Sequence, residues 1–332
     1  VVTTIQHATP AMFMLAESAV AVGEPVIIVA DLRTPSDFHL DGAVCLSVDG
    51  QRHLAFRTAA LAPFNSYARK NIGYLKAISL GAQVVRETDD DNFVGPGFFA
   101  TPPERRAARL PEPALFLNPY LYFDGGGIWP RGYPLDLVLE DRPLTTSPCE
   151  VPAGRTVLQG LADGEPDVDA VFRMTRGGLG VTFADAQPLQ IPSGCYAPFN
   201  SQATCWESET WPLLYLPSTC SFRMTDIWRG YIAQRILHAT GGALVFTAAV
   251  VRQNRNKHNL MSDFRDEIEG YLGYHRFVNA LQETPVESAD DIGGMLRMLY
   301  VRLVEEGFFE PVELERLEGW LEDLASLGGT AP

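Results

Sequence analysis

The run Pro25–Ala30 (PVIIVA) is short, continuous, apolar and rich in β-branched residues. Such a run is typical of a strand that is buried on both faces of a parallel sheet. Asp31 follows directly, and Thr34 and Pro35 indicate a loop just beyond it. The run therefore predicts an inner strand of a parallel sheet, with a carboxylate at its carboxyl end.

Strand and helix patterns alternate on both sides of this run. Val1–Gln6 has the pattern of a strand, and Ala11–Ala21 that of a helix. Further along, strands are expected at Ala43–Val48 and Ala82–Glu87, separated by the helical pattern of Tyr67–Leu80. This alternation predicts a doubly wound α/β sheet. Ligands of such sheets bind at the carboxyl ends of the strands, where the loops open.

The second half of the chain changes from mixed patterns to helical ones. Residues 93–152 are rich in Pro, Gly and aromatic residues and predict loops and short strands. Later helices are expected at Trp228–His238, Met261–Leu281, Ser288–Glu306 and Pro311–Leu327. We therefore expect a catalytic domain over residues 1–258 and a helical subdomain over residues 259–332.

Composition excludes several classes of protein. The 332 residues include 26 basic and 41 acidic side chains, a net charge of −15, which repels nucleic acids and anionic lipids. The five cysteines have no CxxC spacing, so neither a zinc site nor a disulfide framework is expected. No apolar stretch approaches the roughly 18 residues that span a bilayer. We therefore expect no nucleic acid partner, no membrane span and a cytoplasmic location.

Three successive carboxylates, Asp89, Asp90 and Asp91, follow the strand that ends at Glu87. Neighbouring carboxylates raise one another's pKa, and a hard divalent cation that binds their oxygens removes this cost. The same cation neutralises a diphosphate. The run therefore predicts a metal and diphosphate site, although a solvated turn has the same composition.

Other polar residues can complete a nucleotide site. Arg69 and Lys70, on the helix before the acidic run, suit a diphosphate or else form ordinary surface pairs. Asp31 can accept hydrogen bonds from a base or ribose, or cap the next turn. Arg252 and His258 lie in a basic segment after the strand Ala243–Val250. Arg252 can bind a phosphate and His258 can bind a metal, or both can be parts of a solvated loop. Thr4, in the first strand, is also assigned to the nucleotide site.

Asp226 stands at the start of an aromatic and cationic helix. A carboxylate there can act as the general base that deprotonates an acceptor hydroxyl, and it can also serve as an N-cap. Aromatic, amide and charged residues nearby suit a sugar, although each of them can equally be packing. The residues assigned to the acceptor and sugar are Asn200, Gln202, Trp206, Glu207, Trp228 and Arg229.

Six blocks, in order along nearly the whole chain, together resemble the STELLO family of plant Golgi glycosyltransferases. They are Phe64–Ala82 (FNSYARKNIGYLKAISLGA), Trp129–Pro134 (WPRGYP), Asp167–Arg176 (DVDAVFRMTR), Ala197–Trp206 (APFNSQATCW), Thr225–Tyr231 (TDIWRGY) and Asp263–Leu272 (DFRDEIEGYL). A more distant similarity to the UDP-arabinopyranose mutases rests on the acidic run and on Asp226, Trp228, Gly230 and Tyr231.

The resemblance implies a GT-A-like (Rossmann-like) fold and a nucleotide-sugar donor, expected to be UDP-linked. It also implies a metal and diphosphate site at the acidic run, with Mn²⁺ or Mg²⁺ expected at Asp89 and Asp91, and Asp226 as base beside a hydroxyl acceptor such as a glycan. His258, in the basic segment, is the further metal ligand that we expect. STELLO relatives often have two acids where this chain has three, so which of the three binds the metal stays open. The Golgi lumen becomes the expected location only if an N-terminal anchor has been removed.

Three functions agree with these features. The first is metal-dependent transfer of a sugar from a nucleotide diphosphate to a hydroxyl. The second is a mutase that rearranges the sugar on its own nucleotide and needs no acceptor. The third is a catalytically silent scaffold that keeps the fold and binds a protein partner.

Overall fold

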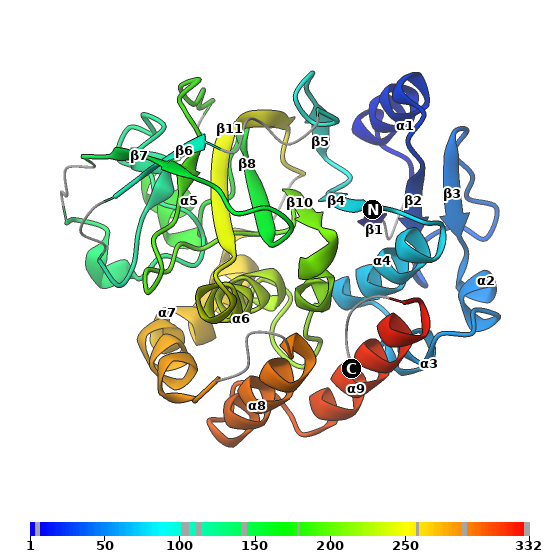
Figure 1. Cartoon of the computed structure of the whole chain (residues 1–332). Helices are drawn as coiled ribbons and strands as arrows, with labels where there is room; N and C mark the ends of the chain where they lie inside the picture. The colour runs from blue at the N-terminus through cyan, green and yellow to red at the C-terminus, as the bar shows by residue number, and fades with distance from the viewer. Residues whose placement is uncertain are drawn as a thin grey trace.

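The computed structural model describes residues 1–3, 7–100, 106–110, 114–140, 145–177, 180–256, 259–286 and 291–328. Within these residues, helices pack against mixed β-structure, and the last three helices form one side of the molecule (Figure 1). The predicted α/β class with carboxyl-terminal helices is therefore confirmed.

A parallel three-stranded sheet contains the run that opened the sequence analysis. Val26 and Ile28 pack in one apolar cluster with helix α1, whereas Ile27 and Val29 pack with Ile72 of helix α4 in another. Because alternate residues of a strand point to opposite faces, helices cover both faces of this sheet. The strands, in the order β1-β2-β3, and the two helices are β1 (Val2–Thr3), β2 (Val26–Val29), β3 (Ala43–Leu46), α1 (Pro10–Val22) and α4 (Lys70–Ser79).

A larger mixed sheet of eight strands follows in the described residues, in the order β4-β10-β8-β11-β9-β6-β7, with β5 paired to β11. Val1 links the two sheets, because its N donates to Arg86 O at 2.5 Å and its O accepts from Thr88 N at 3.2 Å. The strands are β4 (Val84–Thr88), β5 (Asn92–Val94), β6 (Arg106–Arg109), β7 (Ser147–Glu150), β8 (Thr156–Gly164), β9 (Leu189–Gln190), β10 (Ala203–Glu207) and β11 (Ala243–Gln253).

Strand direction places several chain segments at one edge of this sheet. Strands β4 and β8 are each antiparallel to β10, and β8 is parallel to β11. Strands β4, β8 and β11 therefore end at the same edge. Helix α4 leads into β4, and helix α6 (Thr225–Thr240) leads into β11. The beginnings of both helices consequently lie at the edge where the strands end.

The carboxyl-terminal helices share a core with the rest of the chain. One apolar cluster extends from Ala68 to Leu324 and crosses the boundary predicted at residue 258. Asp323 accepts hydrogen bonds from the backbone N of Arg57 and Thr58, at 2.9 and 2.7 Å. The helices involved are α7 (Leu260–Glu283), α8 (Ile292–Glu305) and α9 (Val312–Ser326).

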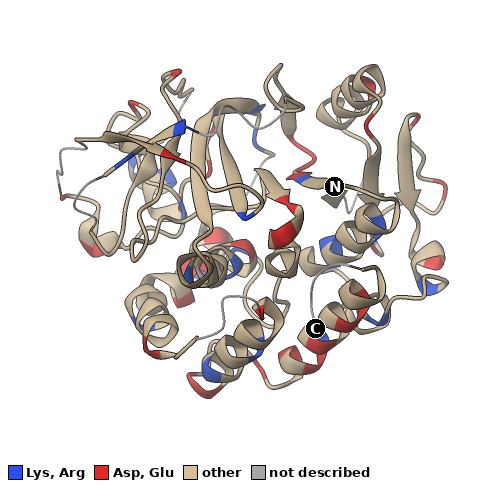
Figure 2. Ribbon diagram, in the orientation of Figure 1, with Lys and Arg blue, Asp and Glu red and all other residues tan. Residues whose placement is uncertain are grey.

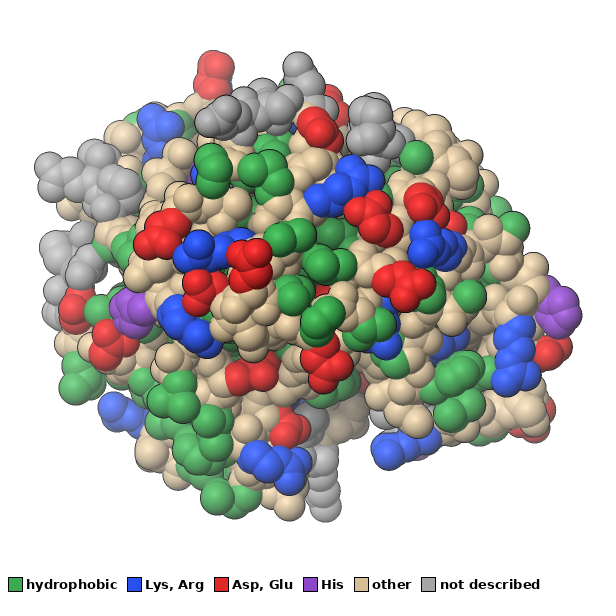
Figure 3. All heavy atoms as spheres, turned by 90° about the horizontal axis from the view of Figure 1, so that it is seen from below, with side chains coloured by type: hydrophobic (Ala, Val, Ile, Leu, Met, Phe, Trp, Pro, Cys, Tyr) green, Lys and Arg blue, Asp and Glu red, His purple; other side chains and the backbone are tan. Residues whose placement is uncertain are grey.

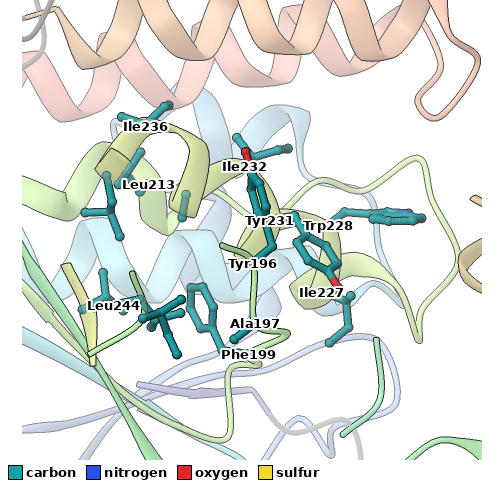
Figure 4. Packing of buried hydrophobic residues seen from close by; sticks show 14 of the residues in the cluster. Tyr196, Ala197, Phe199, Leu213, Ile227, Trp228, Tyr231, Ile232, Ile236 and Leu244 are labelled. Atoms are coloured by element: carbon teal, nitrogen blue, oxygen red, sulfur yellow. The ribbon is translucent and has the colours of Figure 1, made fainter. Parts of the chain in front are cut away.

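Helix α6 is the centre of this core. The Trp228 ring stacks on Phe277 of α7, with 4.1 Å between the ring centroids. Figure 4 shows the α6 side chains Ile227, Trp228, Tyr231, Ile232 and Ile236 packed near Tyr196, Ala197, Phe199, Leu213 and Leu244. The remaining helical segments are α2 (Val48–Arg52), α3 (Arg57–Leu61), α5 (Ala170–Arg176), η1 (Tyr67–Arg69), η2 (Pro119–Leu121), η3 (Leu135–Leu137) and η4 (Ser208–Leu214).

Charged residues are spread over helices and loops (Figure 2), and the face seen in Figure 3 carries both signs interspersed with apolar side chains. Among the helices of the described residues, none combines the length and the apolar character needed to cross a membrane.

Candidate functional site

A buried lysine lies at the sheet edge where β4 ends. The Lys70 side chain is fully buried, and its Nζ donates to Tyr67 Oη at 2.8 Å, Thr88 O at 2.9 Å and Ser201 O at 3.1 Å. It also pairs with Asp89 Oδ1 at 3.2 Å. A buried ammonium group is costly unless it is paired and hydrogen-bonded, and Lys70 meets both conditions. This ion pair fixes the first carboxylate of the acidic run against helix α4.

A chain of hydrogen bonds connects the acidic run with Asp226. Tyr67 Oη donates to Asp89 Oδ1 at 2.6 Å and contacts Ser201 Oγ. The N and Oγ of Ser201 both donate to Asp226 Oδ2, at 3.3 Å. Burial, together with the charges of Asp89 and Asp226, raises the pKa of Tyr67, so its hydroxyl keeps its proton. Four segments that are distant in sequence thus meet at one site.

Asp226 itself is buried in an ion pair. Helix α6 begins at Thr225, so Asp226 lies in its first turn and is not the N-cap. Arg131 Nη1 donates to Asp226 Oδ1 at 2.9 Å, and Arg131 Nη2 donates to Oδ2 at 3.1 Å. Burial alone would raise the pKa of Asp226, but the charge and hydrogen bonds of Arg131 outweigh it and lower the pKa. A carboxylate in this environment is a weak base, since it is held ionised by a guanidinium.

Arg131 also binds a second aspartate. Its Nε and Nη2 donate to Asp167 at 3.0 and 2.7 Å, and Arg223 Nη2 lies 3.7 Å from the same carboxylate. Although burial opposes ionisation, Arg131 and Arg223 lower the pKa of Asp167. Asn200 Nδ2 donates to Asp167 Oδ2 at 2.9 Å. Arg131 therefore joins the loop after β8 to the beginning of α6.

The acidic run is more accessible to solvent than Lys70 and Asp226 are. The Asp89 side chain is 32% exposed, and within the described residues its Oδ2 accepts no hydrogen bond. Gln253 Nε2 donates to both oxygens of Asp91, at 3.2 and 3.1 Å. Burial raises the pKa of Asp91 to about 6, and the charges of Asp89 and Asp90 act in the same direction.

The carboxylates of the acidic run are the oxygen donors that a hard divalent cation prefers. The observation that supports the fit is the partly exposed Asp89, whose Oδ2 accepts no hydrogen bond within the described residues. In the described part of the chain, no group of three His, Cys, Asp or Glu side chains is arranged to hold a metal. His258, the expected third ligand, lies outside the described residues, as does Thr4.

Two of the predicted nucleotide residues are used in loop structure. The Asp31 oxygens accept from Leu32 N at 2.7 Å and from Ser66 N at 3.1 Å. The Arg69 Nη1 donates to Ala62 O at 3.0 Å. The second interpretation of Asp31, as a residue that caps its turn, describes its contacts. Arg252 is exposed near the end of β11.

The predicted sugar-binding residues divide into two groups. Asn200 and Gln202 lie at the edge described above, and Gln202 Nε2 donates to Asn92 Oδ1 at 3.0 Å. Glu207 lies at the opposite end of β10, opposite Val84, where its Oε2 accepts from Thr156 N. This placement removes Glu207 from the candidate site.

Trp206, Arg229 and Trp228 belong to the interior. Trp206 Nε1 and Arg229 Nη2 each bind Glu87 Oε1 at 2.8 Å. Trp206 and Trp228 are 0% exposed, so protein atoms cover the aromatic faces on which a sugar would stack. Helical spacing and aromatic composition do not distinguish a core tryptophan from one that binds a ligand.

Three residues of the site were not identified from the sequence, namely Tyr67, Arg131 and Ser201. Arg131 and Ser201 lie within WPRGYP and APFNSQATCW, two of the blocks that carry the family resemblance. A charged residue inside an otherwise apolar block, such as Arg131, is a signal for a buried ion pair, because burial of an unpaired charge is costly.

The sequence was compared with known proteins. A family model described as STELLO glycosyltransferases matches residues 223–332. Two curated proteins of Arabidopsis thaliana, named Probable glycosyltransferase STELLO1 and Probable glycosyltransferase STELLO2, are each 30% identical over 93% of this chain. The chain spans 42% of the length of each of these relatives.

Proposed function

The chain belongs to the STELLO glycosyltransferase family, and on this premise we propose that it transfers a sugar from a nucleotide diphosphate donor to a hydroxyl acceptor. The donor is expected to be a UDP-sugar. The observation that carries the proposal is the convergence at one sheet edge of the acidic run, Lys70, Ser201 and Asp226. We further propose that the fold is of the GT-A type, because β1 to β4 and the acidic run follow the order expected of such a nucleotide-binding half.

The acidic run and Lys70 act on the diphosphate in this proposal. Asp89 and Asp91 would hold Mn²⁺ or Mg²⁺, which supplies positive charge for the diphosphate leaving group. Lys70 fixes the side chain of Asp89 through the 3.2 Å contact with Oδ1, which leaves Oδ2 available within the described residues. The beginnings of α4 and α6 also lie at this edge, and helix N-termini favour anions.

We propose a different role for Asp226 than the general base expected from the sequence. Both of its oxygens bind Arg131, and the pKa of the carboxyl group is lowered. Asp226 therefore positions Ser201, whose hydroxyl contacts Tyr67 beside Asp89. An Asp226→Glu variant keeps a carboxylate but should move Ser201, and it should lower kcat with little change in the affinity for the nucleotide. If Asp226 were the general base, kcat would instead fall whenever its carboxylate is lost, wherever Ser201 lies.

Nucleotide binding tests the proposal most directly. UDP, CDP and GDP would be titrated into the protein by calorimetry, with Mn²⁺, with Mg²⁺ and with a chelator. A ligand present at 100 times its Kd should stabilise the fold by about 2.7 kcal/mol. The Asp89→Asn variant should lose metal-dependent binding, while Asp37→Asn, at an exposed loop position, should keep it.

Absence of any metal-dependent nucleotide binding would contradict the transferase and would favour the scaffold. If the nucleotide binds, product analysis separates the remaining alternatives. A transferase releases the nucleotide when an acceptor is added, whereas a mutase converts the UDP-sugar without an acceptor.

A further inference from the structure

An exposed phenyl ring stands beside the candidate site. Phe222 is the most exposed Phe, Tyr or Trp side chain among the described residues, at 56%. Its ring centroid is 5.6 Å from that of Tyr67, and the two planes meet at 79°. Tyr67 in turn donates its hydroxyl proton to Asp89. Only one residue, Tyr67, therefore separates Phe222 from the acidic run.

The residues on both sides of Phe222 are anchored to the fold. Ser221 N donates to Glu269 Oε1 at 3.1 Å, and Ser221 Oγ donates to Asp266 O. On the other side, Arg223 Nε donates to Glu267 Oε1 at 2.8 Å, and Met224 is fully buried. Helix α7 therefore holds both neighbours of Phe222 in place, with the ring exposed between them.

Leaving much of a phenyl ring in water forgoes the free energy of its burial. Scattered exposed apolar residues are normal in proteins and need no explanation by themselves. Phe222 differs from the similarly exposed Phe13 in its surroundings, since Phe13 lies on helix α1 and Phe222 adjoins the Tyr67–Asp89 hydrogen bond. Its position therefore points to a ligand that binds at the candidate site.

We propose that Phe222 is a stacking platform for a sugar ring of the acceptor, an inference that rests on the proposed glycosyl transfer. Doubly wound sheets bind the nucleotide over the ends of their first strands, here β1 and β2. Phe222 is attached instead to helix α7, because its neighbours Ser221 and Arg223 form hydrogen bonds with Glu269 and Glu267 of that helix. A ligand that covers Phe222 would therefore contact the α7 side of the site and not β1 and β2, which suits the acceptor better than the nucleotide.

The polar groups around the ring fit a carbohydrate. Binding sites for small molecules combine apolar or aromatic surface with a few polar groups that fix orientation. Glu269 is exposed next to Phe222, and its Oε1 is held by Ser221 N and by Trp228 Nε1 at 3.1 and 3.3 Å. Within the described residues, Glu269 Oε2 remains available to accept from a sugar hydroxyl. The phenyl face covers the C–H face of the ring, and the carboxylate selects its hydroxyls.

Ligand binding to four proteins tests this role. Wild type, Phe222→Ala, Phe222→Leu and Phe222→Tyr would be titrated with cellobiose, maltose and lactose, and separately with UDP and Mn²⁺, and followed by ligand-detected NMR. Phe13→Ala is the matched control, because it removes an equally exposed phenyl group far from Tyr67 in the chain. Circular dichroism would confirm that each variant is folded.

We expect a disaccharide Kd that rises at least tenfold in the Ala and Leu variants and stays within threefold in the Tyr variant. The Kd of UDP should not change. Equal disaccharide binding in the Ala variant, or wild-type protein that binds none of the three sugars, would overturn the role of Phe222. Weakened UDP binding in the Ala variant would also overturn it, since the ring would then serve the nucleobase. Failure of wild type to bind UDP contradicts the proposed function instead, and the sugar titrations still decide on Phe222.

Discussion

Replacement of Arg131 by Met should test the buried ion pairs at the centre of the site. The Arg131 side chain is 6% exposed and pairs with Asp167 and Asp226, which are 10% and 9% exposed. Removal of one partner from a buried ion pair typically costs about 3–5 kcal/mol, because a charge is left buried without compensation. Two carboxylates lose their shared partner here, so we expect a loss of free energy of unfolding toward the upper end of this range.

The loss should depend on pH, and its sign follows from the pKa shifts. In wild type the pKa values of both aspartates are lowered, so the stabilisation is complete above the unfolded-state pKa of about 3.9. In the variant, burial without Arg131 raises the pKa of Asp226, so this carboxyl group takes up a proton as the pH falls from 7 to 5, whereas Arg223 stays beside Asp167. The difference in stability between wild type and variant should therefore shrink over this interval.

Urea unfolding, followed by tryptophan fluorescence at pH 7.5 and pH 5.0, would measure both effects. The double variant Arg131→Met with Asp226→Asn should be more stable than the sum of the single changes predicts, because the unpaired charge of Asp226 is gone. Arg265→Met is the matched control, since the Arg265 side chain is 72% exposed and its pair with Asp266 should contribute at most about 1 kcal/mol. A loss below 1 kcal/mol for Arg131→Met, or a loss equal at both pH values, would refute the reasoning.

Three further changes probe the site and its support. Lys70→Met leaves Asp89 without its buried cation, so binding of UDP with Mn²⁺ should weaken at least tenfold in calorimetry, and unchanged affinity would contradict the role of Lys70. Burial lowers the pKa of His238 to about 4, so stability should fall by up to about 3 kcal/mol as the pH drops from 6.5 to 4. His238→Gln should flatten that part of the stability profile, and an unchanged profile would assign the acid sensitivity elsewhere. Gly230→Ala places a Cβ 2.8 Å from Phe199 O, so the variant should lose about 1–3 kcal/mol, visible as a lower Tm, and an unaltered Tm would show that the backbone can yield there.

Local patterns predicted many elements of the fold because burial of a strand or helix leaves a period in its own residues. The run PVIIVA forms β2, which is buried on both faces. The helix predicted at Tyr67–Leu80 corresponds to η1 and α4, and the helix predicted at Trp228–His238 corresponds to α6. The boundaries moved by a few residues. The GT-A identity of the fold remains a proposal.

The candidate site was predicted less completely than the elements that carry it. Asp89–Asp91 could be located from the sequence because three acids after a strand must stand at its carboxyl end. The Trp228 ring could not be placed, since an aromatic residue at helical spacing has the same pattern whether it contacts Phe277 or a sugar. Glu207 was predicted at the site but lies one strand length away, at the opposite end of β10, because the sequence does not show in which direction that strand runs.

By itself, the sequence determined the α/β class, the position of the acidic run at the end of β4, and the family. Only the tertiary structure decided which charges are partners. Arg131 pairs with Asp226, which is 95 positions away in the sequence, and the Lys70 ammonium group donates to the backbone O of Ser201, which is 131 positions away. The physical reason is that secondary structure follows from interactions between near neighbours in the chain, whereas a buried ion pair is selected by the packing that removes water from both partners at once.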